Sequence, residues 1–168
     1  MSRSTPETET RAASRLPAEE MPVGVEIACG SYKVTETEIV EFASAWDPQY
    51  FHTDHEAAVE SDFRGLIASG VHTTAIFQRL AATQVYTKYD VIAGKEINKL
   101  RFLRPVRAGD VLTGTVVVRS IEPDRPGRCL VTILGELRNQ HGRAVLQLEV
   151  DSLLRSAGAG SRNGADSR

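Results

Sequence analysis

The sequence predicts an α+β protein in which one curved antiparallel β-sheet of about five strands wraps around a central α-helix. Residues 69–86 follow the period of a helix and are apolar around much of its circumference, which is typical of a helix buried on several sides. Residues 96–154 then change to β-branched segments separated by short turns. A buried helix followed by a run of strands favours one helix layer packed on one sheet layer.

The chain length of 168 residues fits a single domain. Residues 1–21 and residues 156–168 are rich in small and polar side chains and offer few apolar groups for burial. Burial in such segments cannot offset the conformational entropy that is lost when the chain becomes ordered. We therefore expect two disordered tails around a folded domain at residues 22–155.

Composition and charge exclude several classes of partner. The formal net charge is −2 and the basic residues are scattered, so neither nucleic acid nor a membrane is expected as a partner. No apolar run approaches the ~20 residues of a membrane span, and no export signal is recognisable, so we expect a cytoplasmic protein. Cys29 and Cys129 lack the spacing of a zinc site. We expect two buried thiols, with one long-range disulfide as the alternative, and no metal or cofactor.

The first helix is expected to begin after Thr35. Thr35 and Glu38 form the S/T-x-x-E pattern of a capping box. Apolar residues follow at helical spacing, namely Ile39, Phe42, Ala43 and Trp46. Pro48 disfavours the helical conformation for the residue before it, so Asp47 is expected where the helix gives way to a loop.

The remaining elements follow in order along the chain. A short helix is expected from Thr53 or Asp54, and a turn at residues 62–65 precedes the central helix. An early strand is expected at residues 23–32, and four more strands follow the central helix, at residues 96–103, 112–121, 128–139 and 144–154. Because short turns join these four strands, we expect them to form an antiparallel meander.

The loop after the first helix carries the residues best suited to catalysis. Asp47, Gln49 and His52 place a carboxylate, an amide and an imidazole within six residues. A carboxylate and an imidazole that reach one water molecule can share proton transfer at neutral pH. The alternative is that Asp47 only shapes the turn and His52 is solvated.

Two stretches resemble a known family. Residues 42–52 read FASAWDPQYFH, and residues 63–70 read FRGLIASG. They are similar to the D-x-N-P-x-H and F-x-G-x-I-A-x-G signatures of the MaoC-like, (R)-specific enoyl-CoA hydratase family, which has the hotdog fold. Weaker likenesses to the same family occur in RPVRAGDVL at residues 104–112 and NQHGRAV at residues 139–145. The chain departs from the signature at Gln49, Tyr50 and Ser69, which indicates a D-P-Q-x-F-H sub-branch.

The resemblance implies a reaction and roles for residues. Members of this family add water to a trans-2-enoyl thioester and form the (R)-3-hydroxyacyl product, or catalyse the reverse dehydration. Asp47 and His52 fall on the signature positions. His52 is expected to act as the base and Asp47 to hold the same water and supply the proton, although the two roles can be exchanged.

Four further residues are expected to bind the substrate: Gln49, Ser69, Gly70 and His72. The backbone N–H of Gly70 lies near a helix N-terminus, where it can donate to the thioester oxygen, but tight helix packing also explains this glycine. Ser69 can hydrogen-bond the substrate or the loop, or cap the helix. His72 either approaches the pocket or has a structural role.

The resemblance also implies partners. The substrate is expected on coenzyme A or acyl carrier protein in fatty acid metabolism or a related pathway, and a homodimer is expected because hotdog domains of this kind pair. One alternative function is a hotdog thioesterase, although such enzymes place a carboxylate on the central helix and residues 68–84 contain none. Another is a non-catalytic acyl-thioester binder or the partner subunit of a heteromeric dehydratase.

Overall fold

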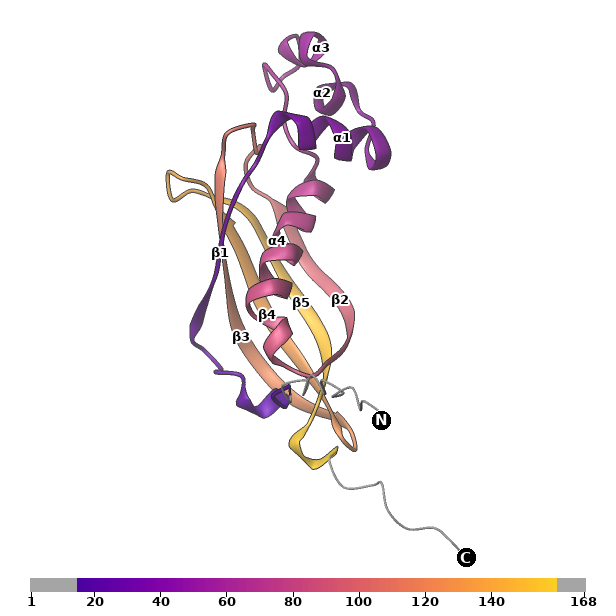
Figure 1. Ribbon diagram of the computed structural model, residues 1–168, viewed down its shortest axis with the longest axis vertical. Helices are drawn as coiled ribbons and strands as arrows, with labels where there is room; N and C mark the ends of the chain where they lie inside the picture. Colours follow the sequence, from indigo (N-terminus) through magenta and orange to yellow (C-terminus); the bar gives the residue numbers. More distant parts are fainter. Residues whose placement is uncertain (1–14, 160–168) are drawn as a thin grey trace, which may run out of the picture.

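The computed structural model of the protein describes residues 15–159. Its long helix α4 (Gly70–Gln84) lies along a curved five-stranded sheet, and three shorter helices gather at the N-terminal end of α4, at the top of Figure 1. The predicted α+β class and the predicted number of strands are confirmed. No helix of the described chain is both long and apolar enough to cross a membrane.

The sheet contains β1 (Glu26–Lys33), β2 (Val91–Phe102), β3 (Val111–Arg125), β4 (Arg128–Arg138) and β5 (Ala144–Arg155) in the order β1-β3-β4-β5-β2. All neighbouring strands are antiparallel. The predicted four-strand meander is wrong for β2, which pairs with β5 at the far edge instead of with β3. A periodic sequence identifies strands but not their neighbours, and residues 103–110 carry the chain across the end of the sheet.

The core lies between α4 and the inner face of the sheet. Strand β4 turns alternate side chains inward, and Gly135 occupies one of these inward positions. A Cβ atom on Gly135 would lie 2.2 Å from the ring of Phe77, so this glycine lets the helix approach the sheet closely. Phe77 is therefore a core residue. Cys29 and Cys129 are both buried free thiols, as the first of the two alternatives predicted.

The folded part of the described chain begins earlier than residue 22. Leu16 N–H donates to Lys88 O at 2.9 Å, and the short 3-10 turn η1 (Ala18–Glu20) follows. Ala18 and Met21 are buried in the core. The expected N-terminal tail is thus too long at its inner end, because two buried apolar side chains and the backbone hydrogen bonds of Leu16 anchor it. Residues 1–14 and 160–168 of the expected tails lie outside the described residues.

The helices that precede α4 position the polar loop. Helix α1 (Glu36–Trp46) is capped as predicted, with Thr35 Oγ1 accepting from Glu38 N–H at 3.3 Å. Helix α3 (His55–Val59) is capped by Asp54, which accepts from Ala57 N–H at 3.0 Å. Between them lies α2 (Tyr50–Thr53), a single turn that the sequence pattern did not predict.

Candidate active site

The loop after α1 brings Asp47 and His52 together. Asp47 caps the C-terminus of α1, and its N–H donates to Ala43 O at 2.8 Å. The turn of α2 then buries His52, which is only 4% exposed. His52 Nε2 lies 3.5 Å from Asp47 Oδ2. The structure therefore brings the two members of the expected acid/base pair side by side.

The segment before α4 determines the tautomer of His52. His52 Nδ1 lies 2.8 Å from the carbonyl oxygen of Ile67. A carbonyl oxygen can only accept a hydrogen bond, so Nδ1 carries the proton of the neutral imidazole. The lone pair of the neutral ring is then on Nε2, which faces Asp47. This orientation leaves Nε2 free to accept a proton.

Asp47 is held in its charged form. Its Oδ2 accepts from Ser69 Oγ at 2.6 Å, and its Oδ1 accepts from Gln49 Nε2 at 2.9 Å. The hydrogen bond from Ser69 and then that from Gln49 lower the pKa of Asp47 below its ordinary value; burial opposes them, and the nearby His52 adds a smaller lowering effect. At neutral pH the group is a carboxylate.

Ser69 joins this pair to the central helix. The residue is fully buried, and its Oγ also accepts from Val71 N–H at 3.1 Å. Ser69 is thus both the N-cap of α4 and a hydrogen-bond donor to the Asp47 loop, two of the three roles considered from the sequence. It does not line the cavity described below, so the geometry gives no support to direct contact with a substrate.

Gly70 opens α4 with a free N–H. No hydrogen bond within residues 15–159 uses this group, which lies at the positive end of a 15-residue helix. The backbone of Gly70 does not have a positive φ. A Cβ atom there would lie 2.6 Å from Cζ of Phe102, so glycine is needed for the close approach of that ring.

These groups line a cavity of about 470 Å³ between the helices and the end of β2. Asp47, Gln49, His52 and Gly70 are all in its wall. Much of the remaining wall is apolar, and it includes Phe51, Phe63, Phe102 and Val106. The cavity combines a few polar groups with an apolar lining, as binding sites for small molecules commonly do.

The pair can hold a water molecule between two acceptors. Asp47 Oδ2 and the lone pair of His52 Nε2 are 3.5 Å apart, and neither can donate to the other in this protonation state. One water that donates a hydrogen to each would satisfy both. The site can therefore move a proton to and from water beside a carbonyl group bound at the Gly70 N–H.

His72 lies away from this cavity. Its ring stacks on Phe42 with a centroid distance of 4.6 Å and an interplanar angle of 11°, and its Nε2 is 3.5 Å from Glu38 Oε1. Burial lowers the pKa of His72, and Glu38 opposes this shift. The expected role in substrate binding is not supported, because His72 faces α1 and does not line the cavity.

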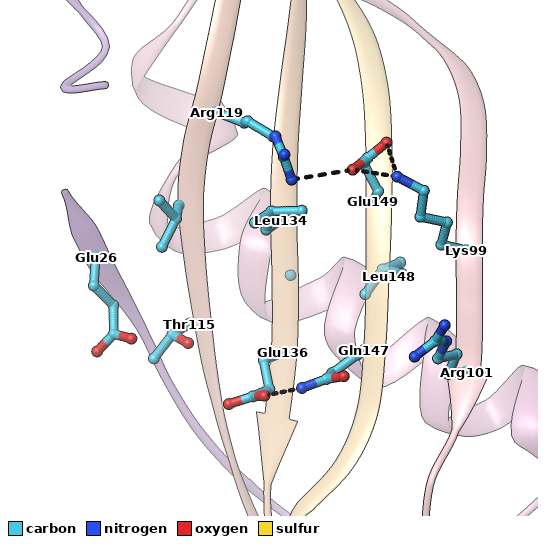
Figure 2. Close-up of a pocket in the computed structure, with 12 residues that line it drawn as sticks. Glu26, Lys99, Arg101, Thr115, Arg119, Leu134, Glu136, Gln147, Leu148 and Glu149 are labelled. Carbon is cyan, nitrogen blue, oxygen red and sulfur yellow. Dashed lines mark hydrogen bonds and ion pairs between the residues drawn. The ribbon is translucent and has the colours of Figure 1, made fainter. Parts of the chain in front are cut away.

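Arg104 and Arg101 line different hollows. Arg104 lines the cavity and donates to Ala144 O at 2.6 Å. Arg101 lies on the outer face, in a hollow of about 410 Å³ where Lys99 and Arg119 pair with Glu149 (Figure 2). Among the described residues, no group of three or more potential ligands is arranged to hold a metal ion.

Phe102 is one of the cavity residues that the sequence did not indicate. It ends β2 and meets Gly70, which is 32 positions earlier in the chain. An aromatic residue in a strand is common, and nothing in the local sequence distinguishes this one. Only the crossing of β2 past the N-terminus of α4 makes it part of the site.

Comparison with known proteins identifies relatives of this chain. A model of the MaoC-like domain matches residues 20–137. The uncharacterized protein YdeM of Bacillus subtilis (strain 168) is 35% identical over 137 residues, which cover 82% of this chain and 97% of YdeM.

Solved structures show the same fold. A MaoC-like dehydratase from Rhodospirillum rubrum is 34% identical with a TM-score of 0.74, and the match covers 84% of this chain and 97% of that one. The unliganded R-hydratase PhaJ1 from Pseudomonas aeruginosa is 25% identical with a TM-score of 0.71, covering 84% and 87%. The curved antiparallel sheet around a long central helix is the hotdog fold, which confirms the expected architecture.

Proposed function

The chain belongs to the MaoC-like domain family, and from that premise we propose that it is a hydro-lyase acting on acyl thioesters. It adds water to a trans-2-enoyl thioester and forms the (R)-3-hydroxyacyl thioester, or catalyses the reverse dehydration. The observation that carries this proposal is the pair of acceptors, Asp47 Oδ2 and His52 Nε2, 3.5 Å apart in one cavity with the free Gly70 N–H.

The proposed reaction begins with a water held between Asp47 and His52. His52 Nε2 takes one proton from the water while its oxygen bonds to Cβ of the substrate. The electron pair of the double bond moves toward the thioester oxygen, where the Gly70 N–H and the helix N-terminus stabilise the negative charge. Addition and protonation from the same side give a syn product.

The lowered pKa of Asp47 favours His52 as the source of the proton for Cα. A carboxyl group that is ionised at neutral pH has no proton to give, whereas His52 has just received one from the water. In this scheme Asp47 orients the water and stabilises the imidazolium. The scheme revises the expectation from the sequence, in which Asp47 supplied the proton.

The assay uses the conjugated absorbance of the substrate. Purified protein with crotonyl-CoA should lose the enoyl absorbance without releasing free thiol. Asp47→Asn and His52→Ala should each lower kcat by ~10²-fold or more, the usual contribution of a general acid or base. The matched control is His55→Ala, because the side chain of His55 is 65% exposed and lines no part of the cavity.

Three results would contradict the proposal. No turnover with any chain length would favour the non-catalytic binder or partner subunit. Release of free coenzyme A would favour the thioesterase, although α4 (Gly70–Gln84) carries no carboxylate. If both variants were as active as the wild type, Asp47 and His52 would not be the catalytic pair.

We also propose a homodimer that forms along β2. This strand is an edge of the sheet, and it exposes Ile92, Ile97, Leu100 and Phe102. An exposed apolar edge strand is suited to pairing with another strand. A second copy of the chain would continue the sheet across this edge, close to the cavity.

A further inference from the structure

A groove lies next to the cavity that contains Asp47 and His52, which is called the catalytic cavity below. It has a volume of about 600 Å³ and runs between α4 and β2. One side of the helix lines it, at positions that helical spacing brings together, namely Val71, Thr74, Ala75 and Gln78. The opposite wall is formed by β2 and β5, with Val91, Ile97, Leu148 and Val150 among its apolar side chains.

This groove extends the catalytic cavity along the helix. Val71 lines both spaces. On α4 the cavity meets residues 70–73 and the groove meets residues 71–78. On β2 the groove meets residues 91–97, whereas the cavity begins at Phe102. Both elements therefore place the groove on the same side of the cavity, so a chain that passed Val71 would enter it.

Phe102 stands at the boundary between the two spaces. It pairs with Leu146, a fully buried residue, so its side chain points to the inner side of the sheet. The ring reaches the N-terminus of α4, where it occupies the space that a Cβ atom on Gly70 would need. Phe102 is 55% exposed, so the ring can be replaced without opening the core.

We infer that Phe102 is a gate that limits the acyl chain and makes short-chain enoyl thioesters the preferred substrates. The inference rests on the proposed function. The thioester binds at the Gly70 N–H, so its acyl chain starts beside the Phe102 ring, which closes the gap between β2 and α4. Short chains fit in the catalytic cavity, and longer ones are stopped before the groove. The residue determines specificity and takes no part in the proton transfers.

Removal of the ring should admit longer chains. The quantity measured is the ratio of kcat/KM for trans-2-dodecenoyl-CoA to that for crotonyl-CoA. The wild type should have a ratio below one, and Phe102→Ala should raise it by about tenfold or more, because each buried methylene favours binding by roughly fourfold. Phe102→Leu should raise it less, and this variant keeps the test available if Phe102→Ala does not fold.

Two further variants locate the effect. Ile92→Ala removes exposed apolar surface from the same strand but lines neither space, so its ratio should equal that of the wild type. Ala75→Phe fills the groove, so adding it to Phe102→Ala should return the ratio toward the wild-type value. A ratio that Phe102→Ala leaves unchanged, or that Ala75→Phe fails to reverse, would overturn the gate, as would a wild type that prefers the long chain.

Failure of the gate can be separated from failure of the proposed reaction. If the wild type turns over no enoyl-CoA, the reaction is disproved and binding of saturated acyl-CoAs is measured by calorimetry. The gate then requires that Phe102→Ala tighten the binding of dodecanoyl-CoA by about tenfold and leave that of butyryl-CoA unchanged. Equal effects on both ligands, or binding of neither, would overturn it.

Discussion

Ser69 links Asp47 to α4, and its replacement tests how the carboxylate is kept charged. Ser69→Ala removes the strongest of the interactions that lower the pKa of Asp47. We expect the pKa of the Asp47 carboxyl to rise, so the acidic limb of the pH dependence of kcat/KM should move to higher pH. Carbon NMR titration of the Asp47 side chain measures the same shift without relying on activity.

The matched control for Ser69→Ala is Thr35→Ala. Both hydroxyls cap a helix, and loss of either cap should lower the free energy of unfolding by about 1 kcal/mol. Only Ser69 contacts Asp47, so Thr35→Ala should leave the titration of Asp47 unchanged. An equal shift in both variants would mean that the pKa responds to helix stability and not to the hydrogen bond.

At the scale of single residues, local spacing predicted the pair but not its surroundings. Asp47 and His52 are only five positions apart, at and just after the end of α1, so their closeness could be predicted from the sequence alone. The contact of Ser69 with Asp47 spans 22 positions, and the ring of Phe102 reaches Gly70 across 32. Such contacts depend on how α4 meets the loop and β2, which no periodicity encodes.

The next scale is that of the elements, where His72 connects α4 to α1. Burial lowers the pKa of His72, so the unfolded chain binds this proton more tightly than the folded one. Stability should therefore rise with pH between the folded and unfolded pKa values, and acidification below the ordinary value of 6.5 should weaken the folded state. His72→Phe keeps a ring against Phe42 without a titrating group.

We expect His72→Phe to lose less stability than the wild type between pH 7 and pH 5. Urea unfolding at both values measures the difference. His55→Gln is the control, because the side chain of His55 is exposed on the surface. If both variants retained the pH dependence of the wild type, the buried imidazole would not be its source.

The elements themselves were predictable to different degrees. The capping residues Thr35 and Ser69 fixed the start of α1 and α4 to within one position. Helix α2 is a single turn with no cap from a side chain, so it left no signal in the sequence. The partner of β2 was not predictable either, since the apolar pattern of a strand does not say which strand lies beside it.

At the scale of the whole molecule, the edge formed by β2 differs from the edge formed by β1. Strand β1 is eight residues long and exposes no large apolar side chain. Strand β2 is 12 residues long and carries several exposed apolar side chains, although its pairing with β5 is interrupted by three register shifts. A long edge with exposed apolar side chains favours further pairing.

A substitution at Ile97 tests whether β2 joins two copies of the chain. The side chain of Ile97 is 53% exposed in one copy, and pairing along β2 would bury it. We expect the wild type to sediment as a dimer and Ile97→Lys to sediment as a monomer, because burying an unpaired ammonium group at the interface is costly. Val59→Lys introduces the same charge at an equally exposed apolar site on α3, away from β2, and should remain a dimer. A monomeric wild type, or a dimeric Ile97→Lys, would exclude assembly through this edge.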